Sequence, residues 1–340
     1  MIWLDVTKSG AARHRSGLTR VTARLGAELG PAQAPVVWGA ALPALPPQDW
    51  YLTAELFSEA ERPGFGAFLG ARPCRLAAIF HDAIPLRLPH LTWPRSVARH
   101  PEYLKLLSRF DRVWAVSADS RRDLAEFWRW QGVEAPPPIE LLPLGADYGG
   151  APRVAAAAPP AGPPSLLCVG ILEPRKNQDF LLDVCEALWA EGLVFELHLV
   201  GRTNPHFGAP LAARMKAIAK RRPGLHFHGA ASDAVMTGLY AGARASVFPT
   251  IAEGCGLPLL ESLWQGVPCV CSDLPALLES AEGGGCVPLP VGDLAAWKAA
   301  LRRVVTDGAW LAGIRTAAVT RPLPTWAGAA AVLCAGLRPL

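Results

Sequence analysis

Short apolar runs alternate with longer stretches of helical period along most of the chain. The apolar runs predict strands, since a parallel strand covered on both faces is apolar throughout rather than at every second position. They comprise residues 2–6, 36–38, 76–80, 112–116, 141–143, 166–170, 195–200, 225–228, 245–249 and 268–271. The longer stretches predict helices over residues 17–29, 94–108, 117–130, 177–191, 210–222, 233–241, 258–265 and 293–306. Strands that alternate with helices in this way indicate parallel βαβ units.

One segment breaks this alternation and divides the chain. Residues 145–165 read GADYGGAPRVAAAAPPAGPPS, with no apolar period and many Pro, Gly and Ala residues, as expected of an inter-domain linker. At roughly 150 residues per domain, a chain of 340 residues also favours two domains. The pattern therefore predicts two doubly wound α/β domains, residues 1–150 and residues 151–321, that face a shared ligand-binding cleft.

Composition and charge exclude several classes of protein. Hydrophobic residues make up 51% of the chain and charged residues 18%, which is typical of a globular protein. The net charge of +4 is spread evenly, because 17 basic and 15 acidic residues precede residue 151 and 16 and 14 follow, so we expect no nucleic-acid partner. Residues 326–337 are too few to span a bilayer, and Asp5 interrupts the N-terminus before any signal-peptide core. We expect a cytoplasmic protein.

Neither the cysteines nor the histidines predict a metal site. The eight cysteines form no Cys-x-x-Cys pair and mostly lie in apolar runs, so we expect small buried side chains rather than disulfides or zinc ligands. His226 and His228 alternate along a predicted strand and are expected to be structural. The sequence has no Asp-x-Asp motif, and we expect no metal cofactor.

The segment from residue 248 to residue 270 has the pattern of an anion site. A buried strand leads into a glycine-rich turn, and a helix begins near Pro258, so we expect the amides of Gly254, Gly256 and Leu257 to hold a phosphate. Glu253 stands at the strand end, and Glu261 is expected on the first turn of the helix. Two carboxylates beside a phosphate can accept hydrogen bonds from sugar hydroxyls. In isolation, the same residues also fit a helix-dipole partner and a surface loop residue.

A second candidate lies after the first strand of the C-terminal half. Gly170 ends that strand, and Arg175 and Lys176 follow in the loop before the next helix. A guanidinium and an ammonium side by side can neutralise a diphosphate. The alternative is a solvated basic loop.

The order of these motifs resembles the retaining nucleotide-sugar glycosyltransferases of family 4. The motifs are Pro-Arg-Lys-Asn at 174–177, two glutamates at 253 and 261, and Phe-His-Asp-Ala-Ile-Pro at 80–85. The resemblance covers nearly the whole chain, and the last motif is similar to that of bacterial polysaccharide and O-antigen transferases, many of them mannosyltransferases. It implies the GT-B fold, with two Rossmann-like domains facing a central cleft. It also implies that residues 322–340 form a terminal helix that returns to the N-terminal, acceptor-side domain.

The resemblance implies a role for each matching residue. Arg175 and Lys176 would bind the donor diphosphate, Glu261 the nucleotide ribose, and Glu253 the donor sugar hydroxyls. His81 would approach the donor sugar near the reacting carbon. The remaining donor-binding positions would be Gly17, Gly170, Gly229, Ala230, Ala231, Gly254, Cys255, Gly256 and Leu257. Cys255 departs from the family, which commonly has an aromatic residue there.

We therefore expect a retaining, metal-independent hexosyltransferase of bacterial polysaccharide biosynthesis. The favoured donor is GDP-mannose, and the acceptor is a saccharide or a lipid-linked saccharide. Alternatives are a UDP- or dTDP-sugar donor, a GT-B-type nucleotide-sugar epimerase, or a non-catalytic sugar-nucleotide-binding scaffold. Residues 86–112 combine basic residues with Leu, Trp and Tyr, so they fit either a peripheral contact with the inner face of a membrane or a solvated helix face.

Overall fold

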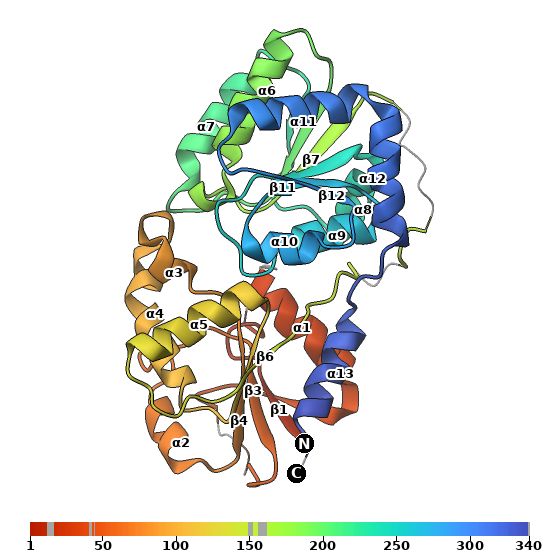
Figure 1. Cartoon of the computed structure of the whole chain (residues 1–340). Helices are drawn as coiled ribbons and strands as arrows, with labels where there is room; N and C mark the ends of the chain where they lie inside the picture. The colour runs from red at the N-terminus through yellow and green to blue at the C-terminus, as the bar shows by residue number, and fades with distance from the viewer. Residues whose placement is uncertain (12–16, 41–42, 44, 149–151, 156–161, 339–340) are drawn as a thin grey trace. The chain divides into compact units, whose positions relative to one another are not determined.

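The computed structural model describes residues 1–11, 17–40, 43, 45–148, 152–155 and 162–338. The chain forms two compact units (Figure 1). The first unit contains residues 1–145 and 324–340, and the second contains residues 146–323. Among the described residues, no helix is both long enough and apolar enough to cross a membrane.

The first unit is built on a six-stranded parallel sheet with the strand order β2-β1-β3-β4-β5-β6. Its strands are β1 (Ile2–Asp5), β2 (Gln33–Val36), β3 (Trp50–Thr53), β4 (Arg75–Phe80), β5 (Arg112–Ala115) and β6 (Ile139–Leu141). Its helices are α1 (Gly17–Leu29), α2 (Phe65–Ala71), α3 (Ile84–Arg87), α4 (Pro94–Leu107), α5 (Ala118–Trp130) and α13 (Trp326–Gly336). Helices therefore lie on both faces of the sheet, as predicted for βαβ units (Figure 1).

The last helix of the chain belongs to the first unit. Helix α13 packs against α1 (Figure 1). Gly145 closely approaches the start of α13, since a Cβ atom at this position would lie 2.3 Å from the backbone nitrogen of Trp326. A glycine is therefore required where the chain leaves the first unit.

The second unit is built on another six-stranded parallel sheet, with the order β12-β11-β10-β7-β8-β9. Its strands are β7 (Ser165–Val169), β8 (Glu196–Val200), β9 (Leu225–Phe227), β10 (Ala245–Phe248), β11 (Cys269–Ser272) and β12 (Cys286–Leu289). Its helices are α6 (Gln178–Ala190), α7 (Gly208–Ala219), α8 (Asp233–Gly242), α9 (Leu257–Trp264), α10 (Pro275–Ala281), α11 (Leu294–Thr306) and α12 (Gly308–Thr320). Helices α6, α7 and α11 bury one apolar cluster, and α8 and α9 contribute to two others.

Serine caps begin two of the helices. The Ser117 hydroxyl accepts a hydrogen bond from the Ser120 amide at the start of α5. Ser232 does the same for the Val235 amide at the start of α8. Each bond pairs a first-turn amide that has no partner within the helix.

Some predicted elements need correction. Strand β2 covers 33–36 rather than 36–38, and Pro35 is tolerated because β2 is an edge strand. The sequence does not predict β3, which has only four residues and follows a proline-rich segment. It also misses β12, α2, α3, α10 and α12, and it places β6 two residues late.

The predicted linker is partly packed onto the second unit. Ala146 is buried in an apolar cluster with Phe248, and the Val154 amide donates a hydrogen bond to the Trp264 carbonyl at 3.1 Å. Residues 149–151 and 156–161 of this segment lie outside the described residues. The second unit therefore begins at residue 146 rather than at residue 151.

Candidate active site

Two loops of the second unit meet where β7 and β10 end. These strands are neighbours in a parallel sheet, so their carboxyl ends lie at the same edge. The Arg175 carbonyl accepts a hydrogen bond from the Ile251 amide at 2.8 Å, and the Thr250 hydroxyl lies 3.0 Å from the same carbonyl. The loop after β7 is thereby fixed to the loop after β10, and the two predicted motifs come together.

Lys176 and Glu253 form a buried ion pair between these loops. The Lys176 ammonium lies 2.5 Å from Glu253 Oε1, and the Arg175 guanidinium lies 3.2 Å from the same oxygen. Both members of the pair have side chains about nine-tenths buried. Thr250 donates a third bond to Oε1 at 2.7 Å, and the ring of Phe248 lies 4.9 Å from the Lys176 nitrogen. Neither Glu253 as a surface loop residue nor Lys176 as a solvated charge fits this geometry.

The contacts of Glu253 leave one oxygen of the carboxylate available. The hydrogen bonds and ion pairs of this side chain with described residues all fall on Oε1. Burial alone would raise the pKa of Glu253, but the charges of Lys176 and Arg175 and the Thr250 hydroxyl outweigh it and hold the pKa below its usual value. Glu253 is therefore an anion, and its Oε2 can accept a hydrogen bond from a ligand hydroxyl.

The same surroundings also lower the pKa of Lys176, which for an ammonium disfavours the charged form. Burial lowers the pKa of its ammonium, because the charged form loses hydration, and the carboxylate of Glu253 opposes that shift. An incoming anion would add to the effect of Glu253 and stabilise the charged form.

Arg175 is oriented by its neighbours. Its guanidinium donates to Glu173 Oε1 at 2.8 Å and 3.1 Å and to the Ala252 carbonyl at 2.8 Å. Asn204, in the loop after β8, donates to the second oxygen of Glu173 at 3.1 Å. Glu173 therefore positions Arg175, a role that the sequence motif does not reveal.

The glycine-rich turn before α9 has the backbone geometry expected of an anion site. Gly256 is the N-cap of α9 at φ +81°, and a Cβ atom there would lie 2.3 Å from a methyl carbon of buried Leu277. Leu257 and Pro258 follow as the first helical residues. Burial raises the pKa of the Cys255 thiol to about 12, so this side chain is a neutral thiol at pH 7. Gly254 is buried beside it.

The position of Glu261 differs from the expected one. Helix α9 begins at Leu257 and has no acidic residue in its first turn, so Glu261 lies in the second turn. It is buried. The alternative interpretation of Glu261 as a first-turn dipole partner is therefore wrong, because the helix begins at Leu257, one residue earlier than predicted.

The loops after β7 and β8 approach each other closely. The Gly201 amide donates to the Gly229 carbonyl at 2.7 Å, and a Cβ atom on Gly201 would lie 1.9 Å from the Gly170 carbonyl oxygen. Only glycine fits there, at φ +152°. The exposed Ala230 and half-exposed Ala231 follow this contact and lead into α8.

The remaining two candidates lie in the first unit. His81 follows β4, and its Nε2 lies 2.8 Å from the Ala54 carbonyl oxygen. A carbonyl only accepts, so Nε2 carries the proton and Nδ1 is an acceptor. Burial lowers the pKa of His81, which favours this neutral ring. Gly17 is the exposed first residue of α1, and residues 12–16 lie outside the described residues.

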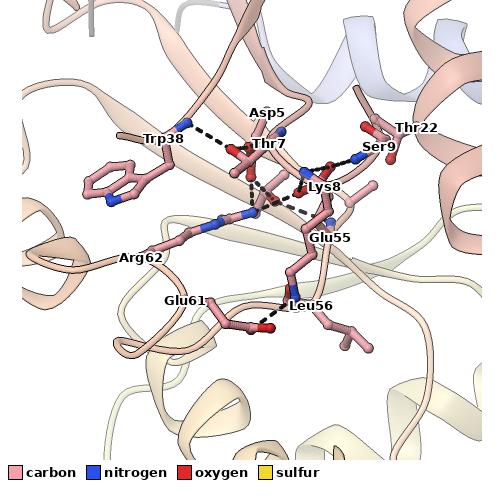
Figure 2. Close-up of polar contacts among 12 residues, drawn as sticks. Asp5, Thr7, Lys8, Ser9, Thr22, Trp38, Glu55, Leu56, Glu61 and Arg62 are labelled. Atoms are coloured by element: carbon pink, nitrogen blue, oxygen red, sulfur yellow. Dashed lines mark hydrogen bonds and ion pairs between the residues drawn. The ribbon is translucent and has the colours of Figure 1, made fainter. Parts of the chain in front are cut away.

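A buried charge cluster holds the start of the loop after β1 (Figure 2). Glu55 accepts hydrogen bonds from the amides of Lys8 at 2.8 Å and Ser9 at 2.7 Å. Arg62, 1% exposed, pairs with Glu55 at 3.0 Å and also with Asp5. The sequence did not predict this cluster, since its members come from a strand end and two loops with no shared motif.

Comparison with known proteins identifies the class to which this site belongs. Residues 163–307 match the family model described as "Glycosyl transferases group 1". The serotype-specific mannosyltransferase WbdA of Escherichia coli is 31% identical over 245 residues, 68% of this chain and 30% of the relative. The O-antigen chain mannosyltransferase B of Escherichia coli is 32% identical over 145 residues, 42% of this chain and 37% of the relative. The matches thus span less than two fifths of the length of these curated relatives.

Solved structures give the fold. The sucrose-phosphate synthase of Thermosynechococcus elongatus superposes with a TM-score of 0.73 at 19% identity, over 98% of this chain and 97% of that chain. Anabaena Alr3699/HepE, solved in complex with UDP and glucose, gives 0.72 at 13% identity, over 99% and 98%. The two parallel sheets with their helices are the Rossmann-like sheets of the GT-B fold, and residues 163–307 are similar in sequence to group 1 glycosyltransferases.

Proposed function

We propose that this protein is a retaining, metal-independent mannosyltransferase that uses GDP-mannose. The observation that carries the proposal is the cluster of Lys176, Arg175 and Glu253 beside the start of α9. Two cations and a helix N-terminus suit a nucleoside diphosphate, and the neighbouring carboxylate suits sugar hydroxyls. Relatives that are named mannosyltransferases support mannose. One of them, from Mycobacterium tuberculosis, is named as GDP-mannose-dependent and is 35% identical over 131 residues (37% of this chain and 32% of the relative).

The proposed transfer needs no group beyond these side chains and the substrates. The bond from the anomeric carbon to the β-phosphate oxygen breaks, and negative charge grows on the diphosphate, where Lys176 and Arg175 stabilise it. The acceptor hydroxyl attacks from the leaving-group face and forms the new glycosidic bond, with retention. Its proton passes to a β-phosphate oxygen, so the products are GDP and the mannosylated acceptor.

The donor is tested by thermal unfolding in the presence of GDP-mannose, UDP-glucose, UDP-N-acetylglucosamine and dTDP-rhamnose. A ligand that binds the folded state raises its stability by RT ln(1 + [L]/Kd), or about 2.7 kcal/mol at a hundredfold excess over Kd. We expect the largest rise in melting temperature with GDP-mannose. A larger rise in melting temperature with another nucleotide sugar would mean that GDP-mannose is not the donor.

The Glu261→Ala variant tests the ribose-binding part of the proposed site. We propose that Glu261 binds the ribose, so its loss should lower the affinity for GDP-mannose and for GDP alike by about tenfold, the loss of a charged hydrogen bond of about 1.5 kcal/mol. Unchanged affinity would remove Glu261 from the ribose site. Glu186→Ala, in α6, where the side chain pairs with Arg214, is the comparison for the loss of a carboxylate elsewhere in the unit.

Metal independence is tested in a turnover assay with GDP-mannose. We expect the rate to stay within twofold after exhaustive EDTA treatment, because side-chain cations and amides stabilise the leaving group. A loss of activity that Mg²⁺ restores would contradict this part of the proposal.

The acceptor is proposed to be a saccharide or a lipid-linked saccharide, with residues 86–112 of the first unit at the membrane surface. Trp93 is 49% exposed there, and the Arg95 guanidinium lies 5.7 Å from its ring. An aromatic ring with an adjacent cation suits a headgroup region. We expect co-sedimentation with vesicles containing anionic lipid to fall when Trp93 is replaced by Ser, and equal binding of the variant would leave the solvated-face alternative.

The non-catalytic scaffold and the GT-B-type epimerase remain the alternatives to transfer. A scaffold would bind the donor without turnover in any acceptor pool. An epimerase would convert the nucleotide sugar without an acceptor. Product analysis of one reaction with and without acceptor therefore separates all three.

A further inference from the structure

Three histidines and a glutamate gather on one face of β8 and β9, in the second unit. Glu196 and His198 lie two residues apart on β8, so they share a face of the sheet. His226, on β9, is the register partner of His198, and His228 follows two residues later. The imidazole rings of His226 and His228 lie 4.6 Å and 5.2 Å from that of His198.

Three of these residues bring donor atoms to one point. One donor atom each from Glu196, His198 and His226 lies within 4.8 Å of the other two. Glu196 Oε2 is 3.2 Å from His198 Nε2, and Glu196 Oε1 is 3.9 Å from His226 Nε2. Ligands of a tetrahedral ion with bonds of about 2.0–2.2 Å lie about 3.3–3.6 Å apart, so small side-chain rotations would complete the arrangement.

His226 gives the second, independent observation. Its Nε2 atom is shielded from solvent and has no hydrogen-bond partner among the described residues. The nearest carboxylate oxygen, 3.9 Å away, is too far for a hydrogen bond. A shielded imidazole nitrogen without a partner is unfavourable, and a bound cation would satisfy it.

His228 has the position of an outer-shell partner. Its Nε2 lies 3.0 Å from Nδ1 of His198. If Nε2 of His198 binds a cation, its Nδ1 carries the proton and can donate it to His228. A ligating histidine is commonly held in this way through its other ring nitrogen.

Two of the three proposed ligand side chains are partly open to solvent. Glu196 and His226 have side chains 39% and 38% exposed, so an ion can enter from solvent.

We propose that Glu196, His198 and His226 form a binding site for one divalent first-row transition metal ion, with Zn²⁺ as its representative. Two imidazoles and a carboxylate suit such borderline ions, whereas Mg²⁺ and Ca²⁺ prefer oxygen ligands alone. The sequence did not predict this site because its ligands come from two strands that are far apart along the chain. The ion would fix the edge strand β9 to β8, and it has no step in the sugar transfer.

The test uses the full chain without a histidine tag, freed of metal with EDTA and dialysed. Calorimetric titration should give one Zn²⁺ per chain, no heat of binding with Mg²⁺, and a higher melting temperature with Zn²⁺. His198→Ala and His226→Ala should each lower the affinity at least tenfold, and His228→Phe by about tenfold or more. Co²⁺ should give visible absorption bands in the wild type that are lost in His226→Ala.

His206→Ala is the matched control, since His206 is exposed elsewhere in the same unit. It should bind Zn²⁺ as the wild type does. Absence of Zn²⁺ binding by the wild type, or equal binding by His226→Ala, would overturn the proposal. If a histidine variant loses its native circular dichroism spectrum, Glu196→Gln, at the start of β8, gives the same comparison. Neither result depends on the donor or on transferase activity, so this proposal and the proposed function can fail separately.

Discussion

Replacing Lys176 by alanine is expected to lower the turnover number by about 10²–10³-fold, as when one stabilising donor is removed from a site of growing charge. In this protein the group removed is the Lys176 ammonium, which lies 2.5 Å from Glu253 Oε1, where the loops after β7 and β10 meet. Without it, Arg175 is the remaining cation of the cluster, and the leaving diphosphate loses half of its side-chain positive charge. The measurement is steady-state turnover with saturating GDP-mannose and acceptor.

The fold should survive this change, so the loss can be assigned to chemistry. In the variant, the Glu253 carboxylate still has the Arg175 guanidinium at 3.2 Å and the Thr250 hydroxyl at 2.7 Å, so its buried charge has two partners. Lys176→Met, which retains the packing on Phe248, should be equally slow with a near-normal melting temperature. Lys216→Ala, an exposed lysine of α7, is the control and should turn over normally. Turnover of Lys176→Ala within threefold of wild type would remove Lys176 from the proposed role.

The sequence predicts much of the framework of this cluster because local rules determine it. Apolar runs place β7 and β10, glycines and Pro258 place the turn and α9, and adjacent cations stand out at 175 and 176. These features depend on neighbours along the chain. The sequence therefore predicts which loops carry charge.

Contacts between distant segments were not predictable in the same way. The pairing of Lys176 with Glu253 depends on the order of β7 and β10 in the sheet, and the role of Glu173 depends on where Arg175 points. The histidines of β8 and β9 likewise meet only through strand register. Even the position of Glu261 moved by one residue, from the first turn to the second, because the helix begins at Leu257 rather than at Pro258.

The second large effect is expected from Arg62→Met, which should destabilise the first unit by about 3–5 kcal/mol. Arg62 is the cation between the carboxylates of Asp5 and Glu55, and all three side chains are buried (Figure 2). Removing one member of a buried ionic cluster leaves charge without compensation, which typically costs this much. Its guanidinium also lies 4.8 Å from the Phe57 ring, a contact that Met would partly replace. Denaturant unfolding, followed by tryptophan fluorescence, measures the loss.

Variants with neutral side chains separate the effect of the buried charge on stability from the effect of packing. The triple variant Arg62→Met, Asp5→Asn, Glu55→Gln should recover much of the lost stability, because no buried charge remains. Arg99→Met removes a half-exposed pair with Glu61 and should cost about 0–1 kcal/mol. The amides of Lys8 and Ser9, which Glu55 holds, should exchange hydrogen faster in Arg62→Met than in Arg99→Met. If the exchange rates stay equal and stability is unchanged, the cluster does not hold the loop after β1.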